Sequence, residues 1–589
     1  MTADGGVPAL GSYKVPKTPW GEPDLQGTYN ANDLQGIPMQ RAQTVGTRYK
    51  LSDDEFKQRV AQRDQNVAND NSDEFSLDRA EEFEARFGTV GGAVSPPPHW
   101  LERARSVSRV SSYIIEPADG RIPALTPAAQ AAAQQRQQAQ AARRRQLNGI
   151  EADWTTDRSN YDRCISTGVL NSVTPKIYNS GSRIVQGPGW VAFQNEMIHE
   201  TRVIPTDGRK NVHGAIKNWM GNSVGRWEGD VLVVEVTDHN DRTWLDAAGN
   251  FHSNALRVTE RYAMRDANTI DYSATIEDPN VFSRPWTIRV PLHRETDLPR
   301  LYEYHCQAEK SEANGDFERD PLTWYPAPIP VGNTPFDARG GAPLPAPKPA
   351  GTIRRLPDGK PDISGWFEID AGGGNYGLES SPQIFLTPAS RGLVVDPPDG
   401  KLPYQTWARA ERTARAQPHR GYDDPTAHCF LAGIPRSHYV PQPVHILQPP
   451  GYVVVLFERM SWRQIAMTAR PPLPDHVRLW QGDSHGRWEG DTLVVESKNF
   501  NGKAWLNEVG DIVSHMETVV ERFTPIDDDT IIYRATVTDP IPYTRPWTIE
   551  VPMHRKADEL LEVACHEDNE DLEHLKHVRD EFRAGQQEN

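Results

Sequence analysis

Short apolar runs separated by turn residues recur along most of the chain. The run 232–234 follows the turn 228–230, which has glycine at its centre, and further runs follow at 256–262, 269–276 and 286–291. A glycine turn between two apolar runs is a hairpin signal. Several short strands joined by regular turns are typical of a β-sandwich or a closed barrel. The pattern therefore predicts mainly antiparallel β structure.

The same pattern occurs twice. GRWEGDVLVVE at 225–235 returns as GRWEGDTLVVE at 486–496, and RPWTI at 284–288 returns at 545–549. These matches indicate a tandem duplication of a unit of roughly 230–300 residues. We expect a first barrel-like unit in 1–320, a second in 351–589, and between them a linker at 321–350, where proline is frequent.

Two segments of the first copy have helical signals instead. Ser52 and Glu55 form a capping box that opens a helix at about 50–65. Thr126 and Pro127 begin an Ala/Gln/Arg-rich run that we expect to be helical to about residue 146. Its composition gives it no wide apolar face, which predicts a solvated helix.

Composition narrows the function classes. The chain has 589 residues and a formal charge of −17, which argues against a nucleic-acid partner. It has no apolar run near 18 residues, so we expect no membrane span. It also has no nucleotide, flavin or common zinc-protease motif, so we expect an enzyme that uses no cofactor. The partner that we expect is a small molecule, and the oligomeric state is left open.

The four cysteines flank the two repeated cores. Cys164 precedes the first core and Cys306 follows it, and Cys429 and Cys565 flank the second in the same way. This placement predicts disulfides 164–306 and 429–565 and an oxidising compartment, although four buried thiols remain the alternative. The first residues have neither a basic nor an apolar signal region, which fits a cytosolic protein or a mature exported one.

The repeated motifs resemble those of a large family of uncharacterised bacterial proteins, common in Acidobacteria and usually exported. The shared features are P-D-G-K-P-D-I-S-G (357–365), G-R-W-E-G-D-T-L-V-V (486–495), T-R-P-W-T (544–548) and E-x-x-C-H-E (562–567). The resemblance covers nearly the whole chain and implies a periplasmic or secreted protein, but it implies no activity. The strand pattern is also similar to that of two-barrel lipocalin-like proteins, some of which are hydratases or cyclases, and fold alone does not give function.

The duplication separates structural residues from candidate functional ones. A polar residue present in both copies is expected to be structural, whereas a titratable residue present in one copy is a candidate for chemistry. An ungapped alignment from Gly189 and Gly451 pairs His199 with Ser461 and Arg202 with Gln464. If NEMIHETR (195–202) is a strand, His199 lies on one face. The other face then carries Glu196 and Arg202, and a Glu–Arg pair there could simply be solvated.

Four histidines of the first copy have no counterpart in this alignment: His199, His213, His252 and His305. Converging at one barrel mouth, they could form an acid–base site or bind a metal. The alternative is four unrelated surface or core histidines. Their spacing does not decide between these, and we predict no metal.

A last group of candidates completes the site hypothesis. Glu303 and His305 share one face of a predicted strand and could form an orienting pair, with Tyr304 on the other face. Asp246 corresponds to Asn507, so its carboxylate is specific to the first copy. The catalytic candidates are His199, His305, Glu196, Glu303 and Asp246. The substrate-binding candidates are His252, His213, Arg202, Tyr304 and Trp190. His438, in the second copy, ranks below them.

We therefore expect two lipocalin-like barrels and an acid–base enzyme of the lyase, hydratase, isomerase or cyclase type, needing no cofactor. Its substrate would be a small apolar or aromatic molecule in a water-poor barrel. A carrier of apolar ligands is one alternative. A carbohydrate-active protein is another, because the chain has 16 tryptophans and many carboxylates.

Overall fold

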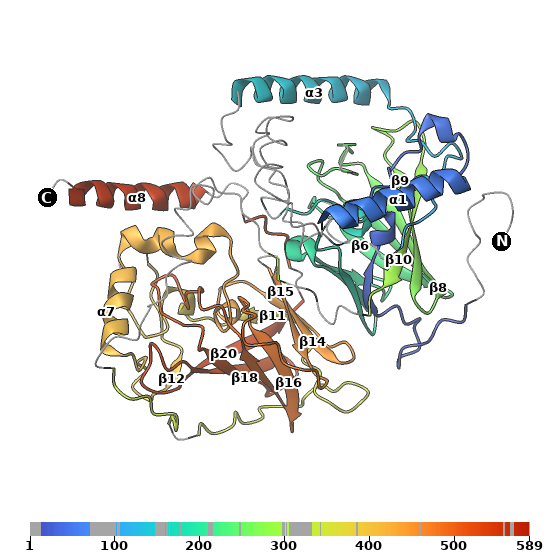
Figure 1. Cartoon of the computed structure of the whole chain (residues 1–589). Helices are drawn as coiled ribbons and strands as arrows, with labels where there is room; N and C mark the ends of the chain where they lie inside the picture. The colour runs from blue at the N-terminus through green and yellow to red at the C-terminus, as the bar shows by residue number, and fades with distance from the viewer. Residues whose placement is uncertain are drawn as a thin grey trace. The chain divides into compact units, whose positions relative to one another are not determined.

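The structure is a computed structural model of the chain, and it divides into two compact units, residues 1–304 and 305–589 (Figure 1). The described residues are 13–70, 102, 106–147, 160, 163, 165–176, 178–209, 216–246, 249–296, 301, 303–304, 333–341, 343–383, 387–458, 461–557, 560–565 and 570–587.

Nine described strands of the first unit form barrel 1, in the order β5-β4-β3-β1-β10-β9-β8-β7-β6. Neighbouring strands in this order are antiparallel. β2 (Ile114–Glu116) is not part of the order and pairs with β10. The ladder is not continuous, because the described parts of β5 and β6 lie side by side without pairing. The strands are β1 Gly27–Asn30, β3 Ser182–Gly187, β4 Trp190–Asn195, β5 Thr201–Pro205, β6 Asn222–Glu228, β7 Val231–Thr237, β8 Arg257–Asp266, β9 Thr269–Glu277 and β10 Trp286–Arg294.

Barrel 2, in the second unit, repeats this topology and closes it. β11 pairs with both β13 and β20, and β15 meets β16 through a parallel bridge between Ala466 and His485. β12 (Val394–Asp396) pairs with β20. The strands are β11 Gly365–Ile369, β13 Val444–Leu447, β14 Tyr452–Phe457, β15 Ser461–Ala466, β16 Asp483–Glu489, β17 Thr492–Lys498, β18 Thr518–Pro525, β19 Thr530–Thr538 and β20 Trp547–Lys556. The prediction of a mainly β protein with two related barrels is confirmed.

The repeated phrase GRWEGD builds the same hairpin in each barrel. Gly229 and Gly490 have φ of 63° and 58°, which is the left-handed region that the turn requires. Gly225 and Gly486 have a different role, because the neighbouring strand packs closely against them. A Cβ on Gly225 would lie 2.9 Å from Cγ2 of Ile204, so the close approach of β5 and β6 depends on this glycine. The repeated phrase is thus structural in both copies.

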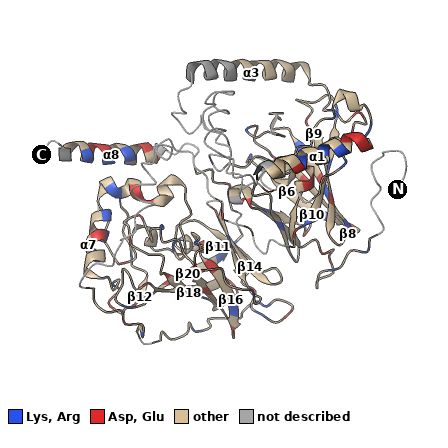
Figure 2. Ribbon diagram, in the orientation of Figure 1, with Lys and Arg blue, Asp and Glu red and all other residues tan. Residues whose placement is uncertain are grey.

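The helices α1, α3 and α8 are not part of either sheet. Ser52 and Glu55 exchange hydrogen bonds as a capping box at the start of α1, and Ala129 N donates to Thr126 Oγ1 at the start of α3. Figure 2 shows charged residues of both signs along α1 and α8. Among the described residues, no helix combines the length and apolarity needed to cross a bilayer. The α-helices are α1 Asp53–Asp70, α3 Pro127–Leu147, α4 Val169–Val173, α7 Thr406–Arg415 and α8 Glu570–Gln587. The 3-10 helices are η1 Asn32–Leu34, η2 Gln43–Val45, η5 Met197–His199, η6 Gly374–Tyr376, η7 Pro418–Asp423, η8 Pro425–His428 and η9 Arg436–His438.

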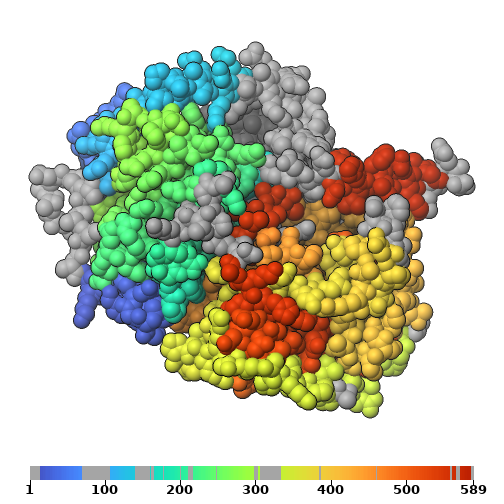
Figure 3. All heavy atoms as spheres, turned by 180° about the vertical axis from the view of Figure 1, so that it is seen from behind, coloured from blue at the N-terminus to red at the C-terminus, as the bar shows by residue number. Residues whose placement is uncertain are grey.

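The described part of the proline-rich segment, from residue 333, runs along barrel 2 (Figure 3). Asp337 N donates to Thr544 O at 2.8 Å, and Ala350 N donates to Ile526 O at 2.7 Å. These bonds join it to the second unit. This part of the predicted linker is therefore bound to a barrel and is not a free spacer.

Cys429 and Cys565 form a disulfide with 5.8 Å between their Cα atoms. It joins the end of η8 to the segment that precedes α8. The predicted pairing in the second copy is confirmed and is compatible with an exported protein. Cys164 and Cys306 lie outside the described residues.

Candidate functional site at one end of barrel 1

A buried ion pair lies inside barrel 1. Arg202 donates to Glu260 through Nη1 at 2.7 Å and through Nη2 at 3.1 Å. The hydroxyls of Tyr262 and Tyr272 donate to the same carboxylate at 2.9 and 3.0 Å. Burial acts to lower the pKa of Arg202, but the charge of Glu260 outweighs it and holds the pKa above its ordinary value. Arg202 therefore remains charged, and three side chains donate hydrogen bonds to Glu260.

Barrel 2 contains the equivalent ion pair, and a histidine lies beside it. Arg463 Nη1 donates to Glu521 Oε1 at 2.8 Å, and Tyr533 donates to the same oxygen at 3.0 Å. The ring of His438 lies beside the pair, with Nε2 3.5 Å from Arg463 Nη1, and it is fully buried. Arg463 also donates to Ser484 Oγ at 3.0 Å. The ion pair is thus a feature of both copies.

This equivalence corrects the ungapped alignment. Arg202 lies opposite Phe193 in the β4–β5 ladder. Arg463 lies opposite Val455 in the β14–β15 ladder. The turn of the first copy is one residue longer, so Arg202 corresponds to Arg463 and not to Gln464. Arg202 is therefore not specific to one copy.

The predicted strand through NEMIHETR is also wrong. β4 ends at Asn195, η5 follows, and β5 begins at Thr201. Ile198 has a φ of 66°, which breaks the extended conformation and reverses the chain. Neither Arg202 nor Glu196 is solvated, since both are buried. The side chain of His199 lies outside the described part of the structure.

A pair of buried histidines lies at the end of barrel 1 where β7 ends and β8 begins. The rings of His239 and His252 are 5.8 Å apart and nearly perpendicular. His252 Nε2 lies 2.7 Å from Thr243 Oγ1, and its Nδ1 lies 3.0 Å from Ser253 O. Burial lowers the pKa of both imidazoles, that of His239 to about 3. His239 Nε2 is buried and has no hydrogen-bond partner among the described residues.

The polar character of this pair is specific to barrel 1. Pairing of β6 with β7 and of β16 with β17 relates the two copies by a constant offset through this region. At the three positions of the histidine pair and its threonine, barrel 2 has apolar residues: Phe500 for His239, Val513 for His252 and Ala504 for Thr243. The same positions of the fold therefore carry apolar side chains in one copy and an imidazole pair with a threonine in the other.

Glu200 adds a carboxyl group at the same end. It follows η5, stands two residues before Arg202 in extended backbone, and is 6% exposed. Burial raises its pKa, although bonds to Ser166 and Asn195 and the charge of Arg202 act to lower it. Its Oε1 has no hydrogen-bond partner among the described residues. Barrel 2 has Ser461 at this position.

Lys176 is a further titratable group near Glu200. Its ammonium donates to Ser172 O at 3.2 Å, and part of the residue reaches solvent. Burial lowers its pKa to about 8, against the opposing charges of Glu200, Glu102 and Glu196. Glu196 Oε1 accepts a hydrogen bond from Asn179 at 2.6 Å. The end of barrel 1 thus combines a carboxyl group, two imidazoles and an amine, and burial shifts the pKa of each.

The interior at this end is also more polar than its counterpart. Ser182 and Asn195 face each other across β3 and β4, and the serine hydroxyl donates to the amide oxygen at 2.8 Å. The equivalent residues of barrel 2 are Val444 and Phe457, both in its apolar core. Polar side chains therefore replace apolar ones on two neighbouring strands.

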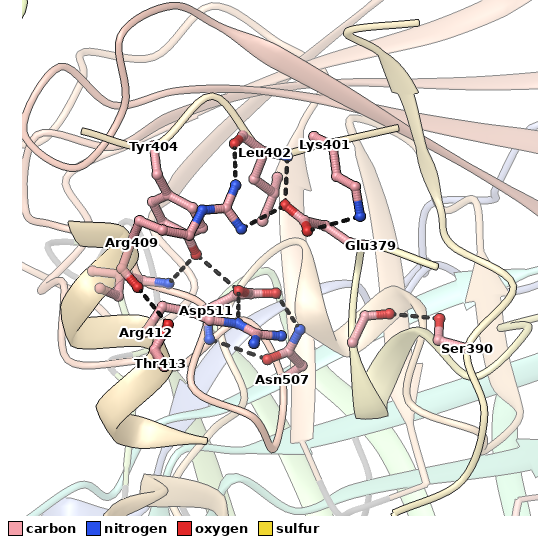
Figure 4. A network of polar contacts seen from close by, with 12 residues as sticks. Glu379, Ser390, Lys401, Leu402, Tyr404, Arg409, Arg412, Thr413, Asn507 and Asp511 are labelled. Atoms are coloured by element: carbon pink, nitrogen blue, oxygen red, sulfur yellow. Dashed lines mark hydrogen bonds and ion pairs between the residues drawn. The ribbon is translucent and has the colours of Figure 1, made fainter. Parts of the chain in front are cut away.

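The corresponding end of barrel 2 is filled by a bonded network (Figure 4). Asp511 accepts from Tyr404 at 2.9 Å, from Arg412 at 3.1 Å and from Asn507 at 2.6 Å. Tyr404, Arg412 and Asn507 come from separate loops and α7, so the network holds that end together. We place the candidate site in barrel 1, where His239 Nε2 and Glu200 Oε1 are buried and have no hydrogen-bond partner among the described residues.

The other predicted residues divide into four groups. Asp246 accepts from Asn250 N at 3.1 Å and from its Nδ2 at 2.6 Å, which gives it a role in a turn. Trp190 begins β4 and so lies at the opposite end of the strand from Asn195. Glu303 and Tyr304 are partly buried but do not lie in a strand, contrary to the prediction. His213 and His305 lie outside the described residues.

Sequence reasoning missed His239, Lys176 and Thr243. His239 and Thr243 could have been found, because the offset between the two GRWEGD phrases pairs them with Phe500 and Ala504. Lys176 could not, because it stands in a loop whose length differs between the copies. Among the described residues, no group of three or more histidine, cysteine, aspartate or glutamate side chains is placed to hold a metal ion.

Comparison with protein-family models, with curated proteins and with solved structures found no match to this chain.

Proposed function

We propose that barrel 1 is the catalytic unit and that it performs acid–base chemistry on a small neutral molecule with an apolar or aromatic body. The observation that carries this proposal is the exchange of three apolar residues in barrel 2 for His239, His252 and Thr243 in barrel 1, at the same end of the barrel as Glu200. Buried polar groups destabilise a fold unless they are paired, so their concentration in one copy favours a function.

Glu200 is the proton-transfer group in this proposal. Burial raises its pKa, which brings a carboxyl group closer to the neutral range in which it both takes and returns a proton. Its Oε1 has no partner among the described residues and is available to a substrate. Glu200 as carboxylate would remove a proton from a substrate carbon and return it as carboxylic acid to a neighbouring atom.

His239 acts as a neutral hydrogen-bond donor. With a pKa lowered to about 3, its imidazole is uncharged at neutral pH and too weak a base to remove a carbon-bound proton. In the tautomer with hydrogen on Nε2, it donates to a substrate oxygen and stabilises the negative charge that develops there. His252, held by Thr243 and Ser253, fixes the ring beside it. Proton transfer next to a polarised oxygen is the chemistry of isomerases, hydratases and lyases.

The test uses residues that the second copy already accommodates. A metabolite extract is incubated with the wild type, with Glu200→Gln and with the double variant His239→Phe/His252→Val, and mass spectrometry follows consumption. The control is His438→Phe, which changes barrel 2 alone. We expect a compound that the wild type and the control consume and that both barrel 1 variants leave intact.

Two outcomes would overturn the proposal. Equal consumption by Glu200→Gln and the wild type would remove the proton-transfer group. A compound that binds unchanged to the wild type and both barrel 1 variants would identify a carrier, the alternative function of such barrels.

A further inference from the structure

A row of polar side chains lines the place where the described parts of β5 and β6 lie side by side without pairing. Ser223 on β6 lies opposite Val236, and Trp227 lies opposite Leu232. Both partners belong to the core, so these two side chains face the interior. Thr206, just after β5, faces the same way, because its Cγ2 lies 3.0 Å from the position of a Cβ on Gly225.

The hydrogen-bonding atoms of this row are buried and unsatisfied. Ser223 Oγ, Thr206 Oγ1 and Trp227 Nε1 have no hydrogen-bond partner among the described residues. Glu200 Oε1 has none either, and it belongs to a side chain that is more than nine-tenths buried at the start of the same strand, β5. Each buried polar group left unpaired costs about 1–3 kcal/mol. Several in one row indicate a partner that the described residues do not supply.

In barrel 2, the positions equivalent to the two hydroxyls are either apolar or hydrogen-bonded. Met467 replaces Thr206. Ser484 replaces Ser223, and its hydroxyl is bonded to Arg463 and to Ser497, each at 3.0 Å. The strands themselves are joined by the bridge at Ala466. The two unsatisfied hydroxyls are therefore specific to the unit that carries the candidate site, whereas the tryptophan recurs in barrel 2 as Trp488.

We propose that the seam between β5 and β6 of barrel 1 binds the body of the substrate, and that this substrate is a neutral, elongated molecule bearing hydroxyl, ether or carbonyl oxygens. Two hydroxyls and an indole N–H recognise such oxygens, and an indole face also packs on apolar carbon. Two charged side chains, Glu200 and Arg202, share this face of β5, and Arg202 is already bonded to Glu260. This disfavours an anionic or cationic body. This inference rests on the proposed function, in which the reacting end of the substrate lies at Glu200.

The first test is crystallographic. Crystals of the full chain are soaked in 1,3-propanediol, a neutral probe with two hydroxyls. We expect a diol with its oxygens within hydrogen-bond distance of Thr206 Oγ1 and Ser223 Oγ, and none at the equivalent place in barrel 2. A seam that holds only water, or a diol bound equally in both barrels, would overturn the proposal.

The second test measures stability in the absence of any ligand. Thr206→Val and Ser223→Ala remove unsatisfied hydroxyls, so each is expected to raise the melting temperature of its unit by about 2–4 °C while diol binding is lost. The matched control Ser484→Ala removes a bonded hydroxyl and is expected to lower it. A fall in the Thr206 and Ser223 variants as large as in the control would show that these hydroxyls are already satisfied, and the seam proposal would be abandoned. Loss of turnover in Glu200→Gln would still stand in that case, so the two proposals fail separately.

Discussion

Arg202 and Glu260 are joined by two hydrogen bonds in the interior of barrel 1, and neither side chain is more than 7% exposed. Removal of one partner leaves the other as an uncompensated buried charge. Arg202→Met is therefore expected to destabilise barrel 1 by about 3–5 kcal/mol, measured by urea unfolding. Replacing both residues, in Arg202→Met/Glu260→Leu, should recover much of this loss.

The surface offers the control for this prediction. Arg226 pairs with Glu228 at 2.9 Å on the outside of the same barrel, and both side chains are more than 40% exposed. Arg226→Ala should cost less than about 1 kcal/mol, because water screens exposed pairs. A similar loss in Arg202→Met and Arg226→Ala would contradict the account of the buried pair.

His438 makes the stability of barrel 2 depend on pH. Burial lowers its pKa from 6.5 to about 3, so the folded state binds this proton less readily than the unfolded chain does. Its stabilising contribution is complete above pH 6.5 and is lost as the pH falls from 6.5 toward 3, by up to about 1.4 kcal/mol per pH unit.

His438→Phe should flatten this dependence, since a phenylalanine ring does not titrate and the site is lined by Phe457, Phe523 and Tyr533. The comparison is urea unfolding between pH 7 and pH 4. His577, which is 72% exposed on α8, provides the control variant His577→Gln, which is expected to keep the wild-type slope. An unchanged slope in His438→Phe would mean that other groups carry the acid sensitivity.

The barrels could be predicted from sequence because their signals are local and occur twice. The turn at Gly229, the alternation along β18 and β19 and the repeated hairpins each specify strands without any distant contact. The site could be predicted only in part. The turn after Asn195 is one residue longer than its counterpart, which shifts the ungapped alignment. Arg202 is therefore paired with Gln464 there, although it corresponds to Arg463. That Glu200 and His239 lie at the same end of barrel 1 depends on the strand order, which sequence spacing does not encode.

Asp246 and Asn507 show how a copy-specific carboxylate can be structural. Asp246 accepts from Asn250, while in barrel 2 Asn507 donates to Asp511, so acid and amide are exchanged between the same two positions. The double variant Asp246→Asn/Asn250→Asp should therefore melt within about 2 °C of the wild type and keep its turnover, because one bonded pair replaces its mirror arrangement. The single variant Asp246→Ala, which leaves Asn250 without its acceptor, should melt lower. Loss of turnover in the stable double variant would restore Asp246 as a catalytic candidate.

The disulfide Cys429–Cys565 should stabilise barrel 2 and leave barrel 1 unaffected. It closes a loop of 136 residues that contains β13 to β20. Cross-linking so long a loop restricts the unfolded chain, and removing such a bond typically costs about 2–5 kcal/mol. Cys429→Ala/Cys565→Ala should therefore lower the urea midpoint of the barrel 2 transition. A reductant should do the same to the wild type and have no further effect on that transition in the variant.

Because a bond of this kind persists only in an oxidising compartment, this loss would also support export. An equal midpoint with and without reductant would show that the α8 segment gains its attachment from packing alone, and the stability argument for an exported protein would fall.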